Sequence, residues 1–466
     1  MTVTDNRSAP ATDSLAMHSP LRGRLEQLVQ RYRSRVPLAA ALILIAAALW
    51  GYRGHNVSLL GPPLGVFGGQ DLRATLRGAQ EAAAGVSPYR HAIEFGRAVN
   101  FKEFMGWETA PYVYPPIVAV LSQPLSTLPA ELAANVWLII SFAMLIGSAV
   151  AAVAAFSEAG LRNATGRLVL IGVLFVVFRP VQLDLQLAQV DIWVLFLLLL
   201  SFWLYRTGRT TTALTLALAM SIKPIVAPML IFFVWRRQWR IILWTIVWGA
   251  LLTAIGFFAT SWNWLGDYVE VNRLWASGAM LAYPVNQSPT GVALRFFTDN
   301  AYSSPLLRLP WLGQLAPIAI GLRAAAGWWF GVRRTAAANV MTRDRIVYAL
   351  TLTTVGLISP LTEDIHFVWM LMPLSAILLA GLDDLQHQRS VWPFIIGLGL
   401  ALYLGYPELH KAIYYGWDSL ALNNTLVEGR FTPLMGAYLY GLIALDVFIV
   451  IYLVTRHRRQ LSAPRL

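Results

Sequence analysis

The chain has 466 residues, of which 57% are hydrophobic and only 13% charged, and its formal net charge is +12. Soluble domains contain about 25% charged residues, so this composition excludes an ordinary soluble protein, and the absence of cysteine excludes disulfides and thiol catalysis. Most basic residues lie in short clusters between apolar runs, as in the cytoplasmic loops of membrane proteins, so we do not expect a nucleic-acid partner.

The amino-terminal segment, residues 1–35, is predicted to be cytoplasmic. Residues 1–20 are rich in Ser, Thr, Ala and Pro, a composition typical of disordered chain. Residues 21–35 have the pattern of a basic amphipathic helix, which the positive-inside rule places in the cytoplasm. The first apolar run, residues 36–52, is not followed by a small-residue cleavage site, so we expect a retained helix and not a signal peptide.

A long, mostly polar loop, residues 53–111, follows this first span and is predicted to be external. It contains Asp71 just after two glycines, then a short helical pattern, then a Gly-Val-Ser-Pro-Tyr turn that ends at Tyr89. A carboxylate this close to a membrane span is either an interfacial residue or a catalytic group at the membrane surface. Most such carboxylates are interfacial, and the second interpretation depends on the residues that the rest of the chain supplies.

Apolar runs of about 18 or more residues predict an all-α polytopic protein with about twelve transmembrane helices within residues 36–455. After the first, the second span opens at Tyr112-Val-Tyr114-Pro-Pro. The other predicted spans are 131–156, 167–179, 190–205, 210–235, 241–258, 312–332, 345–360, 367–382, 390–406 and 433–454. Arginine clusters place both termini inside, including the tail 456–466, and place the loops 259–311 and 407–432 outside.

The topology between 157 and 235 is less certain, because twelve spans put Arg162, Arg206 and Arg209 outside. One alternative makes Lys223-Pro224 the tip of a re-entrant hairpin, with 206–209 inside. The length of 210–235 favours a single helix kinked at Pro224, and this is the topology that we predict.

Three polar sets fall on the predicted outer face: Asp71, the triplet Asn286-Gln287-Ser288, and the turn that contains Glu363, Asp364 and His366. A carboxylate and a histidine at one membrane face suit general acid–base chemistry, and the two amides suit hydrogen bonds to sugar hydroxyls. Each set also has a plainer interpretation. A lone histidine is often an interfacial residue, and an Asn-Gln-Ser triplet is usually a turn or a helix cap.

Lys223 is the one lysine within an apolar stretch, and a buried lysine needs an anion or a water-filled path. One interpretation is a contact with a lipid-linked phosphate. The alternatives are snorkelling to an interface or an ion pair with Asp184 or Asp191. Arg179, directly before Pro180, is a second candidate for binding a phosphate.

The order and spacing of several short motifs resemble the GT-C membrane glycosyltransferases, specifically glycosyltransferase family 87. The resemblance extends over about residues 60–370. The motifs are Asp71, Gly85-x-x-Pro88-Tyr89, Tyr114-Pro115-Pro116, Gln189-x-Asp191, Lys223-Pro224, Asn286-Gln287-Ser288 and Ser359-Pro360 with His366. That family includes mycobacterial polyprenol-phosphate-mannose-dependent α-(1→2)-mannosyltransferases and a related arabinofuranosyltransferase.

The resemblance implies a GT-C fold in the plasma membrane of a bacterium, with an extracytoplasmic active site. The donor would be a polyprenyl-phosphate sugar, first of all mannose, and the acceptor a glycolipid or polysaccharide, with inversion at the transferred sugar. The predicted site includes no cofactor and no metal, and metal dependence stays open, because Asp71 with Glu363 or Asp364 could hold a divalent ion if they meet. Asp71 would be the general base and His366 a second catalytic residue. The residues implied to bind donor phosphate are Lys223, Arg179 and Gln189, and those implied to contact substrate are Tyr89, Tyr114, Asn286, Gln287, Glu363 and Asp364.

Two departures from the family's pattern leave questions open. The chain has Ala188-Gln189-Val190-Asp191 where Gly-Gln-x-Asn is expected, and it has Glu363 and Asp364 where a histidine soon after Ser-Pro-x-x-Trp is expected. The second departure leaves open the acceptor's identity and whether Glu363 or Asp364 shares the catalytic role. Within the enzyme class, an arabinofuranosyltransferase is the alternative. A transporter or lipid flippase is the rival class, but the two halves show no clear internal repeat.

Overall fold

The computed structural model describes residues 33–51, 69–97, 111–162, 164–277, 281–334, 340–406, 427 and 429–462. Within these ranges the regular elements are all helices, accompanied by two isolated β-bridges. The predicted all-α class is therefore confirmed. Residues 1–32 of the predicted cytoplasmic segment 1–35, and parts of the predicted loops 53–111 and 407–432, lie outside the described residues.

Five helical segments of the described chain are long and apolar enough to cross a membrane, and a bent pair gives a sixth. The five are α6 (Ala130–Phe156), α12 (Trp239–Ala259), α15 (Pro310–Arg334), η5 with α17 (Asp364–Gln386) and η6 with α20 (Gly429–Arg456). The bent pair is α7 (Thr165–Val177) with α8 (Arg179–Leu187), which meet at 55°. A multi-pass membrane protein is thus confirmed, whereas the count of twelve spans is not.

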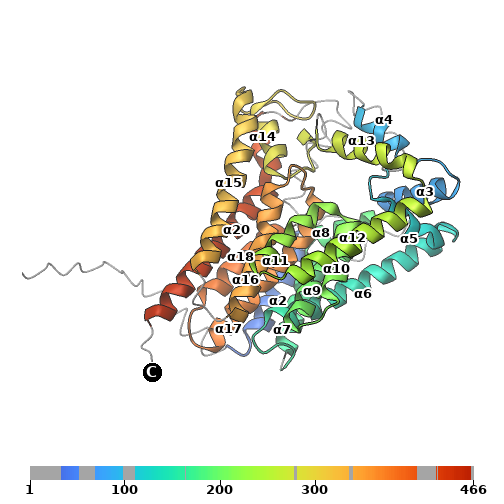
Figure 1. Cartoon of the computed structure of the whole chain (residues 1–466). Helices are drawn as coiled ribbons and strands as arrows, with labels where there is room; N and C mark the ends of the chain where they lie inside the picture. The colour runs from blue at the N-terminus through green and yellow to red at the C-terminus, as the bar shows by residue number, and fades with distance from the viewer. Residues whose placement is uncertain are drawn as a thin grey trace, which may run out of the picture.

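The remaining helices are shorter, and several of them lie within the loop segments at one end of the bundle. In the bundle these are α2 (Val36–Gly51), α5 (Pro116–Ser126), α9 (Asp191–Arg206), α10 (Thr212–Ile222), η2 (Pro224–Met229), α11 (Leu230–Trp235), α16 (Val340–Ile358) and α18 (Trp392–Gly405). In the loops they are α3 (Gln70–Ala83), α4 (Arg90–Arg97), η3 (Trp262–Trp264), α13 (Leu265–Trp275) and α14 (Pro289–Phe297). In the upper part of Figure 1, α3, α4 and α13 lie on the right and α14 lies beside α15 on the left; we call this end of the bundle the loop end.

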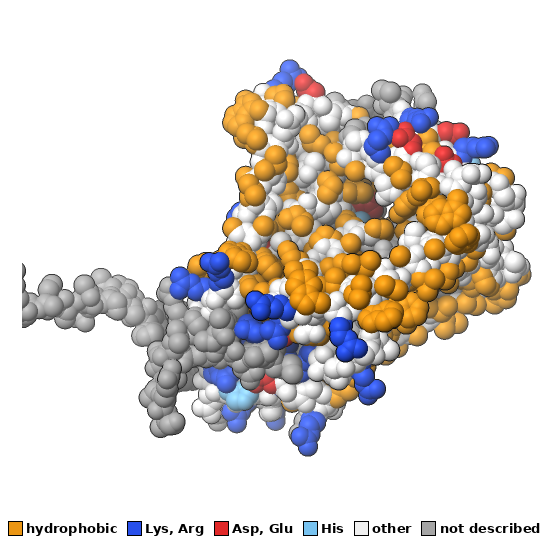
Figure 2. All heavy atoms as spheres, viewed as in Figure 1, with side chains coloured by type: hydrophobic (Ala, Val, Ile, Leu, Met, Phe, Trp, Pro, Cys, Tyr) orange, Lys and Arg blue, Asp and Glu red, His pale blue; other side chains and the backbone are white. Residues whose placement is uncertain are grey.

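The opposite end of the bundle is held together by arginine ion pairs between helices, and we call it the basic end. Figure 2 shows Lys and Arg atoms gathered around it. The pairs are Arg167–Asp383 at 2.8 Å, Arg236–Asp344 at 3.1 Å and Arg456–Glu158 at 3.2 Å. Buried acidic side chains there are therefore neutralised by arginines from distant parts of the chain.

The segment 210–235 does not cross the bundle as one kinked helix. Helix α10 ends at Ile222, Lys223 is extended (φ −133°, ψ 98°), and the chain resumes as η2. Arg236, after α11, donates a 3.2 Å hydrogen bond to the hydroxyl of Tyr205, before α10, so both ends of the segment lie at the basic end. Proline disfavours a helical conformation in the residue before it and lacks an N–H. The predicted single span is therefore wrong, and the hairpin with its tip at Lys223-Pro224 is the arrangement observed.

The same finding removes the anomaly in the arginine pattern. Arg206, at the end of α9, donates hydrogen bonds to the carbonyl oxygens of Ala154 and Ala155 at the end of α6. Its neighbour Tyr205 also donates to Asp344 at the basic end. Arg206 thus lies with the other arginines, as the positive-inside rule requires of residues on one side of a membrane.

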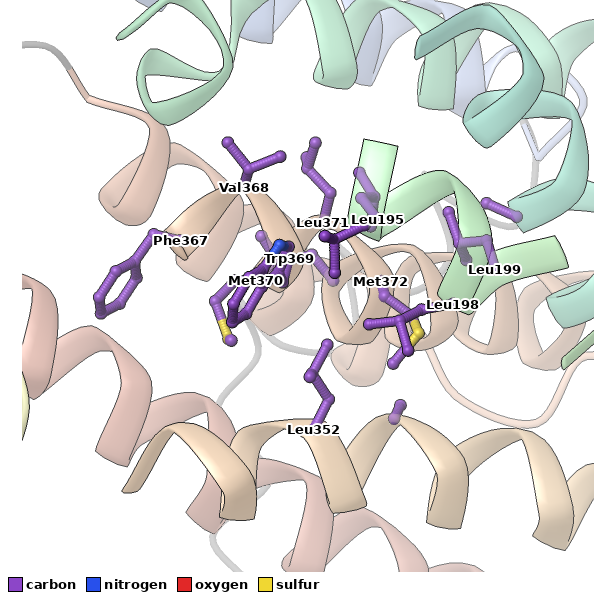
Figure 3. Packing of buried hydrophobic residues seen from close by; sticks show 14 of the residues in the cluster. Leu195, Leu198, Leu199, Leu352, Phe367, Val368, Trp369, Met370, Leu371 and Met372 are labelled. Carbon is purple, nitrogen blue, oxygen red and sulfur yellow. The ribbon is translucent and has the colours of Figure 1, made fainter. Parts of the chain in front are cut away.

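The best-buried part of the core lies where η5 and α17 pack between α9 and α16 (Figure 3). The membrane-span window of η5 and α17 is 100% buried. Its side chains Trp369 and Met372 meet Leu198 of α9 and Leu352 of α16 in this cluster. Close-packed interiors resist small shifts, so the polar residues at the start of η5 are held on a rigid support.

Candidate active site

Asp71 stands in the first turn of α3, and the start of this helix is fixed against α8. Gly69 adopts a left-handed conformation (φ 78°), which costs glycine little. Its N–H donates a 2.7 Å hydrogen bond to the carbonyl oxygen of Gln186. The Asp71 side chain is half-buried, and a carboxylate in the first turn of a helix interacts favourably with the helix dipole.

Gln189 links Asp71 to the bundle. Helix α8 ends at Ala188, which has a left-handed conformation (φ 53°), and Gln189 follows in the short junction before α9. The side-chain Nε2 of Gln189 donates a 2.6 Å hydrogen bond to Oδ2 of Asp71, and its Oε1 accepts a hydrogen bond from the hydroxyl of Tyr114. Three residues from separate parts of the sequence therefore form one connected chain of hydrogen bonds.

Lys223, at the tip of the hairpin, lies beside this chain and pairs with Asp191. Its Nζ is 2.7 Å from Oδ2 of Asp191 and 5.9 Å from the ring centroids of both Tyr114 and Trp369. Asp191 is held in turn, because its N–H donates to Oδ2 of Asp184 at 3.0 Å. Of the interpretations drawn from the sequence, the structure shows the ion pair with Asp191.

Two backbone segments that are far apart in the sequence, residues 285–287 and 362–364, form the third wall of the site. The N–H of Gln287 donates to the carbonyl oxygen of Thr362 at 2.7 Å, and the N–H of Asp364 donates to that of Val285 at 3.0 Å. Asn286 and Glu363 form an antiparallel bridge between them. The predicted outer-face sets are therefore brought together.

His366 has a defined tautomer. Its Nδ1 accepts a 3.0 Å hydrogen bond from the N–H of Glu363, so the neutral ring carries its proton on Nε2. The ring stacks on Trp369 with centroids 4.8 Å apart. His366 can therefore donate a hydrogen bond from Nε2 to a bound group.

The electrostatics of the site favour proton transfer near neutral pH. Burial raises the pKa of Asp71 from 3.8 to about 7, while the hydrogen bond from Gln189 lowers it; the charge of Glu363 raises it further and that of Lys223 lowers it. Burial also raises the pKa of Glu363. Figure 2 shows this face of the molecule hollowed between α13 and α15, with acidic atoms visible in the depth of the hollow. General bases work best when their pKa lies near the working pH.

Arg179 is a buried cation of this region with an unused donor. It is 9% exposed and follows the bend between α7 and α8. Its Nη1 has no hydrogen-bond partner among the described residues. Its positive charge lies close enough to Asp364 to act on that carboxylate. A buried guanidinium with a free donor suits a bound anion.

Three of the residues predicted to contact substrate have side chains that form hydrogen bonds to backbone groups of the protein in this structure. The Nδ2 of Asn286 donates to the carbonyl oxygens of Leu281 and Pro360 at 2.9 and 3.1 Å, and its Oδ1 accepts the N–H of Thr362. The Nε2 of Gln287 donates to two carbonyl oxygens in the same manner. The hydroxyl of Tyr89 donates to the carbonyl oxygen of Tyr114 at 3.0 Å. Their substrate contacts stay predictions.

The sequence interpretation missed Trp369 and Arg295. The indole Nε1 of Trp369 donates to the carbonyl oxygen of Asp191 at 3.2 Å, and its spacing of three residues from His366 was the available signal. Arg295 is fully buried and donates to the carbonyl oxygens of Tyr283 and Asn286, with no distinguishing sequence signal. Among the described residues no group of three or more His, Asp or Glu side chains is arranged to hold a metal ion.

Three comparisons with known proteins were made, and one of them found a match. A comparison with curated proteins and one with solved structures each gave no match. A sequence profile of glycosyltransferase family 87 matches residues 112–360. The matched region includes Tyr114, Gln189 and Lys223, begins after Asp71 and ends before Glu363. Because the match covers more than half of the 466 residues, the chain belongs to glycosyltransferase family 87.

Proposed function

We propose that this membrane glycosyltransferase moves a sugar, first of all mannose, from a polyprenyl-phosphate donor to a hydroxyl of a glycolipid or polysaccharide. The observation that carries the proposal is the half-buried Asp71, which combines a pKa of about 7 with a fixed orientation on Gln189. Soluble enzymes cannot reach the head of a long lipid without extracting it. A helical bundle with a polar hollow at one end provides such access.

In the proposed reaction Asp71 acts as the general base. The acceptor hydroxyl gives its proton to the carboxylate while its oxygen forms a bond to the anomeric carbon of the sugar. The bond between that carbon and the phosphate oxygen breaks, and its electron pair leaves with the polyprenyl phosphate. Attack from the face opposite the phosphate inverts the anomeric centre and gives an α-linkage from a β-linked donor.

The leaving phosphate gains negative charge, so cations and hydrogen-bond donors beside it stabilise the transition state. Arg179 fits this role, because its Nη1 has no partner among the described residues. His366 supplies the Nε2–H donor. Lys223 is already paired with Asp191, so its contribution to the phosphate is through its electrostatic field. Glu363 remains the second carboxylate beside Asp71 and is proposed to contact a sugar hydroxyl.

The orientation follows from charge. The basic end carries the arginine pairs between helices, and cytoplasmic loops are enriched in arginine and lysine. We therefore place the basic end in the cytoplasm and the site on the extracytoplasmic face of a bacterial plasma membrane.

The test uses the full-length protein in liposomes with radiolabelled polyprenyl-phosphate mannose and a glycolipid acceptor mixture. We expect Asp71→Asn to reduce transfer by about a thousandfold, since a general base supplies 10²–10⁴-fold. Asp299→Asn is the matched control, because Asp299 is an exposed loop-end carboxylate paired with Arg308. Transfer at the wild-type rate by Asp71→Asn would refute the general-base role. Product from polyprenyl-phosphate arabinose alone would identify the arabinofuranosyl donor instead.

A further inference from the structure

We propose that Gln189 is a positioning residue for Asp71 and not a ligand of the donor phosphate. Tyr114 holds the Gln189 side chain, whose amide NH₂ binds Oδ2 of Asp71. Oδ1 of Asp71 is then left for the acceptor hydroxyl. This inference rests on the proposed function of Asp71. It reassigns a residue that the sequence had placed with the donor phosphate.

The first step is that the Gln189 amide has one favourable orientation when Asp71 is ionised, the form in which Asp71 acts as a base. An ionised carboxylate accepts hydrogen bonds and cannot donate them, so the NH₂ group must face Oδ2 of Asp71, 2.6 Å away. Oε1 then faces the hydroxyl of Tyr114, which donates to it. With the amide reversed, two oxygen acceptors would face each other.

The second step is that Tyr114 is itself fixed. Its side chain is buried, its carbonyl oxygen accepts the hydroxyl of Tyr89 at 3.0 Å, and its ring lies edge-on to that of Tyr112 with centroids 5.8 Å apart. Nζ of Lys223 lies 5.9 Å from its ring centroid. The fixed Tyr114 side chain therefore holds Gln189 in place, and Gln189 in turn orients the carboxylate of Asp71.

The third step concerns the backbone that supports Gln189. Its N–H donates to the carbonyl oxygen of Asp184 at 2.9 Å, and Oδ2 of Asp184 accepts the N–H of Asp191. The junction between α8 and α9 is thus held on both sides of the glutamine. Gln189 is 7% exposed, so its amide cannot be exchanged for water without an opening of the junction.

The fourth step is that the two oxygens of Asp71 are not equivalent. Oδ2 is occupied by Gln189, and no described residue donates to Oδ1. The charged and titratable groups that face Asp71 are Glu363, Asp191, Lys223 and Tyr114. Among them Lys223 favours the ionised carboxylate and the two acids oppose it. A hydrogen bond to the charged form keeps a carboxylate ionised, so loss of Gln189 must raise the pKa of Asp71.

The test reads the ionisation of Asp71 directly, in the full-length protein without substrate. Infrared difference spectra between each protein and its Asp71→Asn counterpart follow the Asp71 carboxyl band as the pH is raised. We expect Gln189→Leu to move the midpoint upward by about one pH unit, since a hydrogen bond to a charged group is of that size, and Tyr114→Phe to move it less. An unchanged midpoint overturns the inference, whatever the transfer activity.

Kinetics supply the second readout. Gln189→Leu should lower kcat at pH 7 by about tenfold, shift the acidic limb of the pH profile upward, and leave the KM for the donor within about twofold. Gln182→Leu is the matched control, because Gln182 is a buried glutamine of the preceding helix α8 that donates to Val176. A raised KM for the donor, with no shift in the acidic limb of the pH profile, would show instead that Gln189 binds the donor phosphate. Full activity of Asp71→Asn would instead refute the proposed base.

Discussion

The two ends of the bundle both bury charged side chains, but they neutralise them differently. Three acidic residues at the basic end, of which Asp383 and Asp344 are buried, have arginine partners within 3.2 Å: Asp383 with Arg167, Asp344 with Arg236, and Glu158 with Arg456. At the candidate site Asp191 has Lys223, whereas no ion pair within the described chain involves Asp71, Asp184 or Glu363.

The difference separates groups that hold the fold from groups that are left for substrate. A buried charge without a partner costs free energy, so a protein retains it where function requires it. At the basic end the buried carboxylates of Asp383, Asp344 and Asp384 each have an arginine partner. The site keeps an excess of carboxylates and an arginine, Arg179, with an unused donor. Substitutions at the basic end should therefore change stability, and substitutions at the site should change transfer.

The largest effect on stability is expected for Arg167→Met. It leaves the buried carboxylate of Asp383 without its 2.8 Å partner, and such a loss typically costs about 3–5 kcal/mol. The free energy of unfolding in detergent is the measurement. Combining Arg167→Met with Asp383→Leu should recover most of the loss, because both charges are then removed. An unfolding free energy equal to that of the wild type would contradict the structural role of the basic end.

The next largest effect, a loss of donor binding, is expected for Arg179→Met. Charge-assisted hydrogen bonds contribute about 1.5–3 kcal/mol, which corresponds to a rise of about 10–100-fold in KM for the donor. Stability should not fall, because Arg179 forms no ion pair with any residue that the structure describes. Arg308→Met is the control, since Arg308 is an exposed arginine 3.4 Å from Asp299. Lower stability with an unchanged donor KM would make Arg179 a structural residue.

The sequence predicted the long helices well, because an apolar run must be about as long as the hydrocarbon core is thick. The expected span 131–156 corresponds to α6 (Ala130–Phe156), and 241–258 to α12 (Trp239–Ala259). The hairpin over 210–235 was misassigned, since its total length equals that of one span. Tertiary contacts distinguish the two arrangements, because Arg236 and Tyr205 bind each other and both contact Asp344.

The residue types of the site were predictable, but their partners were not. Gln189 and Asp71 are separated by 118 positions, and nothing local in the sequence joins them. Lys223 had open alternatives that differed only in tertiary contacts. For Asn286 the sequence could not distinguish a substrate contact from a structural one. An amide that suits a sugar hydroxyl also suits backbone carbonyl oxygens, and Asn286 binds two of them.

The smallest effect is expected for Tyr89→Phe, and it tests whether a polar group near the site belongs with the fold or with the substrate. Tyr89 is fully buried, its hydroxyl donates to Tyr114, and its ring lies 5.5 Å from that of Tyr268. A single neutral hydrogen bond contributes about 1 kcal/mol, so the unfolding free energy should fall by that amount while acceptor KM stays unchanged. Tyr440→Phe, which removes an exposed hydroxyl bonded to Pro433, should change neither. A raised acceptor KM with unchanged stability would show that the Tyr89 hydroxyl contacts the substrate, as the sequence predicted. The polar groups that bind substrate would then include Tyr89 as well as Asp71.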